Sequence, residues 1–155
     1  MGLFDRTTKG YVSAPVDVRV ERGAIAFFAE TIGETNPIHF DARAARAAGF
    51  PDVMAPATYP VVLDMAAAKA TERAGQPDLL TLIKADMRCL LHGTESYEYL
   101  GPVFAGDTVQ VTSKVKGFSD ARGGALEIVH LEMEIRHPDR GILAIAHRDL
   151  IHRLS

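Results

Sequence analysis

The spacing of apolar residues early in the chain changes from the period of a strand to that of a helix. Residues 16–21, VDVRVE, alternate valines with charged side chains, which predicts a strand buried on one face and ended by Gly23. From residue 24 to 33, apolar side chains recur at i, i+3, i+4 and i+7, which predicts an amphipathic helix with Gly33 as its stop. The chain therefore opens with a strand followed by a helix.

Two further helices are predicted before residue 78. Asp41 precedes the alanine-rich run ARAARAAG, so we expect an N-cap at Asp41 and a short helix closed by Gly49. Residues 58–75, TYPVVLDMAAAKATERAG, carry a longer helical stripe of apolar positions. Its first half is too apolar for a surface helix, and we therefore expect the rest of the fold to wrap around it.

Beyond residue 78 the pattern is typical of strands. Turns are predicted at residues 119–124 and 137–141, where Gly, Asp and Pro gather. The segments expected to be strands are 79–86, 94–100, 107–118, 124–135 and 142–154. Together with the early strand they predict an α+β fold, in which a long, curved antiparallel sheet wraps around one central helix.

One of these strands departs from simple alternation. Within residues 124–135, Leu126 and Ile128 share one parity, whereas Val129 and the apolar residues that follow it share the other. A β-bulge, or a strand that is buried on both faces, would account for this change of parity.

Length, charge and cysteine content narrow the class of protein. The 155 residues have the length of one domain, 1–155, and a globular composition with 47% hydrophobic and 24% charged residues. A formal charge of −3, with no block of Lys and Arg among aromatics, argues against nucleic acid as a partner. One cysteine, Cys89, excludes an internal disulfide framework. Because no signal peptide or apolar run of membrane-spanning length is present, we expect a cytoplasmic protein without membrane association.

The candidate chemistry lies in GETNPIHFD, residues 33–41. Glu34 and His39 stand five positions apart in an irregular segment fixed by a proline, and they could converge on one water or one substrate hydroxyl for acid–base catalysis. A structural interpretation is equally open, with Glu34 solvated, Asn36 in a local turn and His39 hydrogen-bonded in the protein wall. A metal site with His39 and Asp41 as ligands is disfavoured, because no third ligand stands at a supporting spacing.

The same segment resembles a motif of a known family. GETNPIHFD is similar to the G-D-x-N-P-I-H-x-D motif of the MaoC-like, (R)-specific enoyl-CoA hydratases, which have a hot-dog fold. ARAARAAGFPDVMAPATY resembles that family's overhanging segment and the start of its central helix. LLHGTESYEYLGPVFAGDTVQVTSKV resembles the strand, proline turn and GD hairpin that follow. The resemblance covers nearly the whole chain, and most closely the FAS1-like, or N-terminal, dehydratase subgroup.

The resemblance implies a fold and a reaction. The fold is an antiparallel sheet around one long helix, normally paired with a second hot-dog, so we expect a homodimer or a heterodimer with a second hot-dog subunit. The reaction is the reversible hydration of a trans-2-enoyl thioester to the (R)-3-hydroxyacyl thioester. The expected substrate is an acyl-CoA or an acyl-carrier protein, with no metal and no cofactor beyond the CoA or pantetheine that the substrate carries.

The resemblance also assigns roles to individual residues. By position, Glu34 and His39 match the family's catalytic Asp and His, which bind the reacting water. The residues expected to bind or shape the substrate site are Asn36, Gly49, Ala57 and Thr58. Four cationic side chains could meet the CoA phosphates at a tunnel mouth, although we favour ordinary solvated charges; they are Arg43, Arg46, Lys69 and Arg73.

At two positions the chain departs from the family motif. Glu34 is one methylene longer than the family's Asp. Pro56 stands where active hydratases have a Gly whose amide donates to the thioester oxygen, and proline has no N–H. The amide of Ala57 or Thr58 would then have to donate in its place. Two alternatives therefore stay open: a non-catalytic acyl-CoA-binding or stabilising subunit and, less favoured, a thioesterase.

Overall fold

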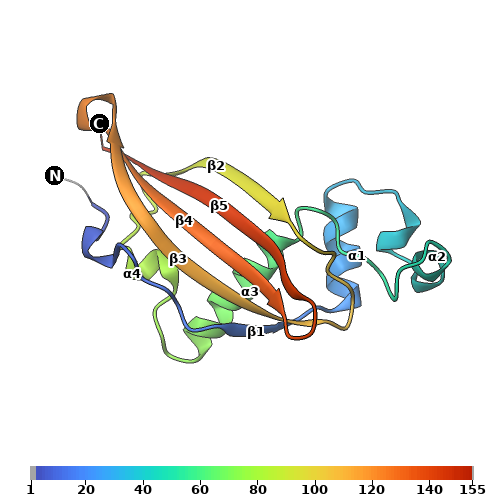
Figure 1. Ribbon diagram of the computed structural model, residues 1–155. Helices are drawn as coiled ribbons and strands as arrows, with labels where there is room; N and C mark the ends of the chain where they lie inside the picture. The colour runs from blue at the N-terminus through green and yellow to red at the C-terminus, as the bar shows by residue number, and fades with distance from the viewer. Residues whose placement is uncertain (1–2, 155) are drawn as a thin grey trace.

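The computed structural model describes residues 3–154, and its sheet combines one early strand with four late ones (Figure 1). The strands are β1 (Val16–Arg19), β2 (Leu90–Tyr99), β3 (Thr108–Ala121), β4 (Leu126–His137) and β5 (Gly141–Arg153). All neighbours pair antiparallel in the order β1-β3-β4-β5-β2, so β1 and β2 form the edges. The predicted antiparallel sheet is confirmed, with five strands in place of six.

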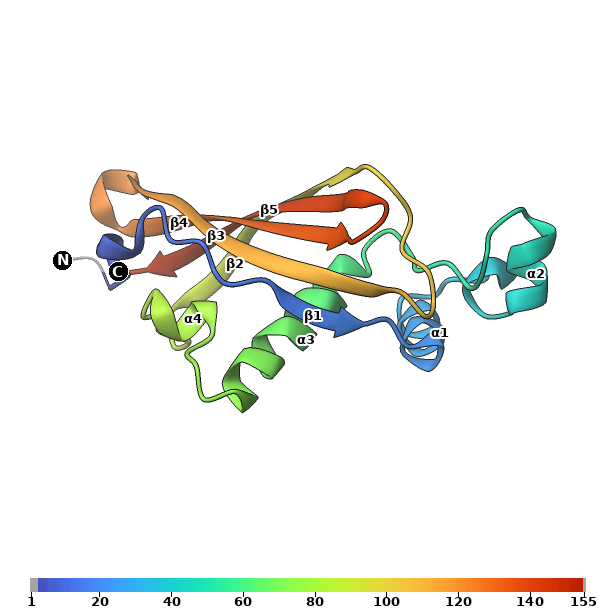
Figure 2. The same cartoon turned by 60° about the horizontal axis from the view of Figure 1, so that its bottom comes forward.

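The helices gather on one face and at one end of this sheet. They are α1 (Arg22–Thr31), α2 (Ala42–Ala47), α3 (Pro60–Arg73) and α4 (Leu79–Leu82), with the 3-10 turns η1 (Arg6–Thr8), η2 (Pro37–His39) and η3 (Arg122–Gly124). The predicted central helix is α3, which runs across one face of the sheet, whereas α1 and α2 lie beyond its end (Figure 2). Among residues 3–154 no helix is long and apolar enough to span a membrane.

The main core forms between α3 and the sheet. Leu63 and Ala67 of α3 are buried against inward-facing residues of the strands, among them Val109, Ile135 and Ala144. Burial of this apolar face, at about 25 cal/mol for each Å² removed from water, is the main force that holds the helix on the sheet. The predicted role of this helix as the centre of the fold is confirmed.

The segment predicted as strand 79–86 was misassigned, because its first part is the short helix α4. Asp78 caps this helix, its carboxylate accepting the N–H of Thr81 at 2.8 Å. Leu79 and Ile83, four residues apart, then reach the same second core cluster beneath the sheet. A short apolar run does not distinguish a strand from a buried helical turn, and the capping aspartate was the signal that decides it.

The predicted boundary at Gly23 also moves. β1 ends at Arg19, and Gly23 lies inside the first turn of α1, which begins at Arg22. The stop at Gly33 is confirmed, since this residue adopts φ +78° and turns the chain away from the helix.

The change of parity in β4 has a different cause from either one predicted. The strand alternates strictly, and its inward positions include Glu127 as well as Val129 and Leu131, so that Leu126 and Ile128 face outward. In the pairing of β3 with β4, the irregularity of register lies in β3, between Val115 and Gly117. A charged residue at a core position therefore produced the apparent slip in the apolar pattern.

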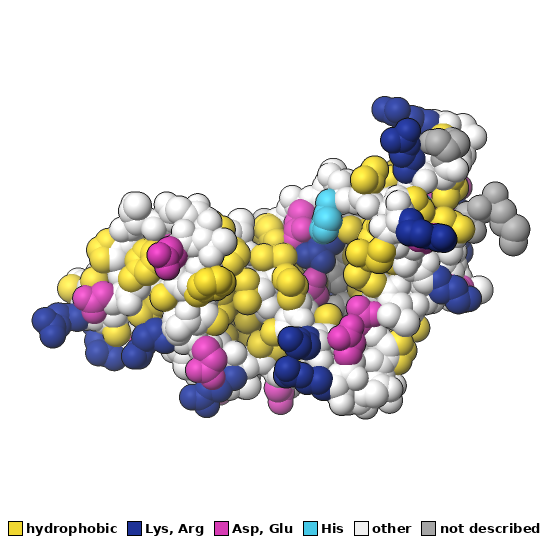
Figure 3. Space-filling model, turned by 180° about the vertical axis from the view of Figure 1, so that it is seen from behind, with side chains coloured by type: hydrophobic (Ala, Val, Ile, Leu, Met, Phe, Trp, Pro, Cys, Tyr) yellow, Lys and Arg dark blue, Asp and Glu magenta, His cyan; other side chains and the backbone are white. Residues whose placement is uncertain are grey.

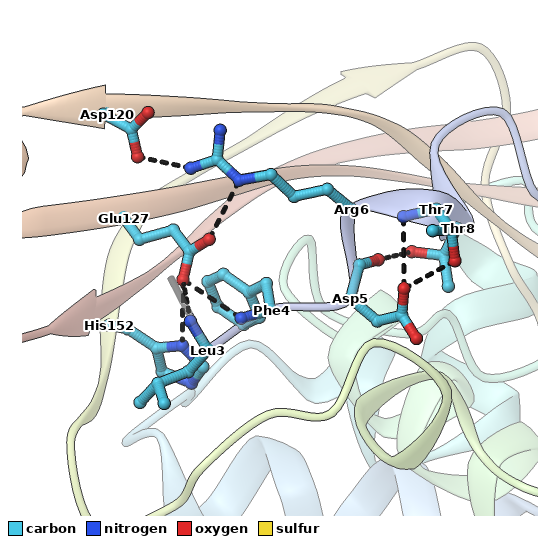
Figure 4. A network of polar contacts seen from close by, with 9 residues as sticks. All are labelled: Leu3, Phe4, Asp5, Arg6, Thr7, Thr8, Asp120, Glu127 and His152. Carbon is cyan, nitrogen blue, oxygen red and sulfur yellow. Dashed lines mark hydrogen bonds and ion pairs between the residues drawn. The ribbon is translucent and has the colours of Figure 1, made fainter. Parts of the chain in front are cut away.

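Glu127 is buried because it receives the N-terminal segment of the chain (Figure 4). One carboxylate oxygen accepts the N–H groups of Leu3 at 2.7 Å and Phe4 at 3.0 Å, and the other accepts from Arg6 Nε at 3.0 Å. The ring of Phe4 stacks on buried His152, with 3.7 Å between ring centroids. We call residues 3–8 the N-terminal clasp, because they close the end of the sheet opposite α1 and α2 (Figure 1).

Candidate active site

The segment between α1 and α2 is folded by local hydrogen bonds. After the turn at Gly33, the N–H of Glu34 donates to the carbonyl of Ala29 at 2.9 Å. Asn36 caps the 3-10 turn η2, since its side-chain oxygen accepts the N–H of Ile38 at 3.2 Å. A proline at the first position of η2 has the backbone angle that this turn requires. His39, at the end of η2, is thereby held on a short, rigid turn.

His39 is held in one orientation by a backbone group. Its Nδ1 lies 2.7 Å from the carbonyl oxygen of Met54, and because a carbonyl can only accept, Nδ1 carries the proton. In the neutral ring Nε2 is then the atom with a free lone pair. That atom lies 3.7 Å from Oε2 of Glu34. The two side chains that the sequence pattern paired are therefore neighbours in space.

The distance between the two groups suits a shared small molecule better than a direct bond. Hydrogen bonds between nitrogen and oxygen centre on about 2.9 Å, so 3.7 Å is too long for a good one. Both atoms are acceptors, so the pair is suited to bind one water or hydroxyl jointly. The His39 side chain is 8% exposed and that of Glu34 is 39% exposed, so such a molecule is reached from the Glu34 side.

An apolar cavity of about 420 Å³ lies next to this pair, between the start of α3 and the sheet. Its lining residues are Met54, Ala55, Pro56, Ala57, Tyr59, Pro60, Tyr99, Gly101, Pro102, Val103 and Ala144. Neither Glu34 nor His39 is among them. Met54 connects the two parts of the site, because its carbonyl holds His39 while the residue itself lines the cavity.

A wider depression of about 790 Å³ lies elsewhere, at the end of the sheet where Leu3 and Arg153 meet. Its walls mix polar and apolar atoms in similar amounts, and none of the candidate site residues contributes to it. We therefore take the smaller cavity as the substrate cavity, because its apolar walls and its contact with Met54 fit the chemistry of the motif.

Two free backbone donors follow Pro56, of which Ala57 lines the cavity and Thr58 does not. The N–H groups of Ala57 and Thr58 donate to no other group in residues 3–154, and both residues are exposed. They lie in the turn that precedes α3, which begins at Pro60, and so stand outside the helix that they were expected to begin. Two free amides therefore stand directly after the proline that lacks one.

Other residues expected at the site are not gathered there. Gly49 lies at the C-terminal end of α2 with φ +90°, and its N–H donates to Arg46, so its role in substrate binding stays a prediction. Arg46 also bonds to Asp52 at 3.3 Å. Lys69 and Arg73 lie in the last part of α3, and Arg43 lies on α2, at separate ends of the molecule. These four cations form no common phosphate site.

Two contributors were missed by sequence reasoning. Tyr99, at the end of β2, lines the cavity, and its hydroxyl donates to the carbonyl of Ala57 at 2.8 Å. Burial raises the pKa of this phenol. The alternation in TESYEYL places Tyr97 and Tyr99 on one face of the strand, and that was the available signal. Met54 contributes through its backbone carbonyl, which accepts from His39, and a pattern of side-chain types does not predict such a contact.

The described residues contain no group of three or more His, Cys, Asp or Glu side chains arranged to hold a metal ion. His39 and Asp41, weighed as ligands from the sequence, have other partners. His39 bonds to Met54, and the carboxylate of Asp41 accepts the N–H of Arg43 at 2.8 Å as the cap of α2. The predicted N-cap at Asp41 is thereby confirmed.

Comparison with known proteins identifies the family. Residues 7–143 match the profile of the FAS1-like, dehydratase domain region, and the chain therefore belongs to that family of dehydratase domains. The UPF0336 protein of Clavibacter michiganensis is 38% identical over 107 residues, which cover 69% of this chain and 68% of that protein.

Solved structures identify the fold. The C-terminally truncated HadBC (3R-hydroxyacyl-ACP dehydratase) complex of Mycobacterium tuberculosis is similar with a TM-score of 0.73 and 19% identity, over 93% of this chain and 96% of that one. The MaoC-like dehydratase of Rhodospirillum rubrum has a TM-score of 0.70 and 19% identity, over 98% and 97% of the two chains. The fold is the hot-dog fold, as the motif predicted.

Proposed function

We propose that this protein is a hydro-lyase that reversibly hydrates a trans-2-enoyl thioester to the 3-hydroxyacyl thioester. The observation that carries the proposal is the pairing of His39 and Glu34 beside an apolar cavity. The carboxylate and the unprotonated Nε2 are both acceptors, so each can take one O–H of a bound water. The oxygen of that water is then free to bond to the β-carbon of the substrate.

The remaining steps follow from the polarity of the thioester. As the oxygen adds to the β-carbon, one member of the pair takes a proton from the water, and that proton then passes to the α-carbon to complete the addition. Negative charge develops on the thioester oxygen before the α-carbon is protonated. The free N–H groups of Ala57, which lines the cavity, and of Thr58, which follows it, are suited to donate to that oxygen. The (R) configuration of the product rests on the motif alone.

The same proposal extends to the substrate carrier and to the partner. A thioester of CoA or of a carrier-protein pantetheine places its acyl chain in the cavity, and HadBC is an ACP dehydratase and a complex by its description. We propose that this chain also pairs with a second hot-dog subunit, either a copy of itself or a different chain. The free side of β2, which is ten residues long and mostly exposed, is the edge available for pairing.

Exposed apolar side chains support this choice of edge. Leu91 and Tyr99 on β2, Leu100 after it and Met65 on α3 are each at least half exposed. Figure 3 shows apolar surface across the middle of the face that is turned away from the viewer in Figure 1, with charged side chains among it. Contiguous exposed apolar patches are typical of protein–protein interaction surfaces.

Turnover of crotonyl-CoA by the purified chain tests the reaction. His39→Ala and Glu34→Gln are each expected to lower kcat by about 100-fold or more, within the range of acid–base catalysis. The double variant should lose much less than the product of the two effects, because the groups act on one water. His147→Ala on the outer face and Glu30→Gln on α1 are matched controls and should keep wild-type turnover. Full activity in either dyad variant would remove that residue from the mechanism.

A second candidate is a binding subunit without activity of its own. Two observations favour it: the dyad does not line the cavity, and Pro56 lacks the amide that active relatives use. Tight binding of acyl-CoA without turnover, together with activity restored by a second hot-dog protein, would establish this function in place of the first. Release of free CoA thiol from saturated acyl-CoA would instead indicate a thioesterase.

A further inference from the structure

Three rows of cross-strand pairs follow one another along β2 and β5, beginning at the cavity. Tyr99 pairs with Ala144, Tyr97 with Ala146 and Glu95 with Arg148. Because side chains alternate along a strand, these three rows lie on the same face of the sheet, the face that α3 covers. The first row lines the cavity, and in the second row Tyr97 pairs with Ala146 and stacks on the ring of Tyr99 from the first.

The third row is an ion cluster that α3 completes. Arg148 binds Glu95 through two nitrogens, at 2.9 and 3.0 Å, and its third nitrogen lies 2.7 Å from Oδ2 of Asp64. Asp64 stands one helical turn after Pro60, which lines the cavity. The hydroxyl of Tyr97 donates to Glu95. We call Asp64, Glu95 and Arg148 the Arg148 cluster.

The Arg148 cluster is largely shielded from solvent and fully paired. The side chains of Arg148, Asp64 and Glu95 are 17%, 22% and 22% exposed. Burial disfavours the charged guanidinium, but its bonds to Glu95 and Asp64 outweigh this and raise the pKa of Arg148. An apolar group placed against this cluster would remove the remaining water from charged groups whose hydrogen-bond partners are already used. The free-energy cost of this desolvation exceeds the gain from burying a few methylenes.

We propose that the Arg148 cluster ends the acyl channel and limits this protein to acyl groups that stop at or before the row of Tyr97 and Ala146. This inference rests on the proposed acyl-thioester function. The cluster has two carboxylates against one guanidinium, so it also rejects an acyl chain that ends in a carboxylate. The substrate class is therefore a short or medium, uncharged acyl thioester.

Binding of saturated acyl-CoAs, from four to sixteen carbons, to the full chain by calorimetry tests this limit independently of catalysis. Within the channel, each added methylene should tighten binding by about four-fold, the equivalent of about 0.8 kcal/mol. Beyond the limit, added methylenes should give no gain or a loss. The triple variant Asp64→Leu, Glu95→Gln, Arg148→Met removes all three charges together, because isolated removal of one would leave buried charges unpaired. In this variant the gain should continue to longer chains.

The matched control is Lys114→Met with Glu132→Gln, an ion pair at 2.9 Å on the opposite face of the sheet, which should keep the wild-type limit. An unchanged limit in the folded triple variant would overturn the proposal. Steady tightening up to sixteen carbons in the wild type would overturn it as well, whether or not the variant folds. A length limit without any hydration of enoyl-CoA would keep this proposal while refuting the hydratase. Absence of binding at every length would refute both.

Discussion

Removal of the charge of Glu127 should destabilise the fold, although this residue lies far from the candidate active site. Glu127→Gln keeps the size of the side chain and one acceptor oxygen. That oxygen can serve either the N–H groups of Leu3 and Phe4 or the guanidinium of Arg6, but not both. In either orientation the new NH₂ group faces a donor. The N-terminal clasp therefore loses one side of its anchor.

The structure sets the size of this effect. One charge-assisted hydrogen bond is lost inside a fully buried site, and bonds of this kind contribute about 1.5–3 kcal/mol. Arg6 itself reaches solvent and keeps its contact with Asp120, so its charge is not left stranded. We therefore expect a loss of about 2 kcal/mol in the free energy of unfolding. With a slope of about 2 kcal/mol per molar urea, the midpoint should fall by about 1 M.

Urea unfolding followed by circular dichroism, at one fixed protein concentration, measures this shift. Asp120→Asn is the matched control, because it removes the other, exposed partner of Arg6 and should leave the midpoint unchanged. If the two variants shift the midpoint equally, the burial of Glu127 adds nothing to the free energy of unfolding and the reasoning is refuted. A large loss in Glu127→Gln alone would support the anchoring role of the clasp.

Four further predictions concern pH, catalysis and assembly. Burial lowers the pKa of His152, and bonds from Phe4 and Arg6 outweigh burial to lower that of Glu127. In both cases the folded state binds fewer protons, so urea midpoints should fall as pH drops below about 6.5 and again below about 4.5, and a flat profile would contradict this. Glu34→Asp should lower kcat if the loop is built for the longer carboxylate, whereas a rise would show that Glu34 fits imperfectly. Pro56→Gly should fold and raise hydration if the missing amide limits the rate; a fall in activity would show that the proline shapes the cavity. Light scattering should give a dimer, and a stable monomer at micromolar concentration would exclude self-pairing through β2.

The sequence predicted the features that depend on residues close together in the chain. The proline and asparagine between Glu34 and His39 favour a tight turn, and in the structure the two side chains do approach each other. The central helix followed from its apolar stripe, because a helix that is apolar on most sides must be covered. Both predictions rest on residues close together in the chain.

The features that sequence reasoning missed depend on contacts between distant residues. Glu127 faces the core only because Leu3 and Phe4, more than a hundred positions away, supply its hydrogen bonds. The tautomer of His39 depends on a backbone carbonyl, which has no signature in residue type. The hydroxyl of Tyr99 reaches Ala57 across 42 positions. Periodicity predicts on which face of a strand or helix a side chain lies, but it does not identify the distant group that the side chain contacts.

The segment from Met54 to Ala57 joins the dyad to the cavity. On one side, the N–H of Met54 donates to Ile38 at 3.0 Å, and its carbonyl accepts from the ring of His39. On the other, the N–H of Ala55 donates to Val103 at 2.8 Å, and the carbonyl of Ala57 accepts from Tyr99. Pro56 lies between these hydrogen-bonded residues; it is buried and has no N–H that needs a partner. A change at Pro56 therefore acts on the imidazole and the cavity wall together, so its effect on kcat should exceed the contribution of one missing amide.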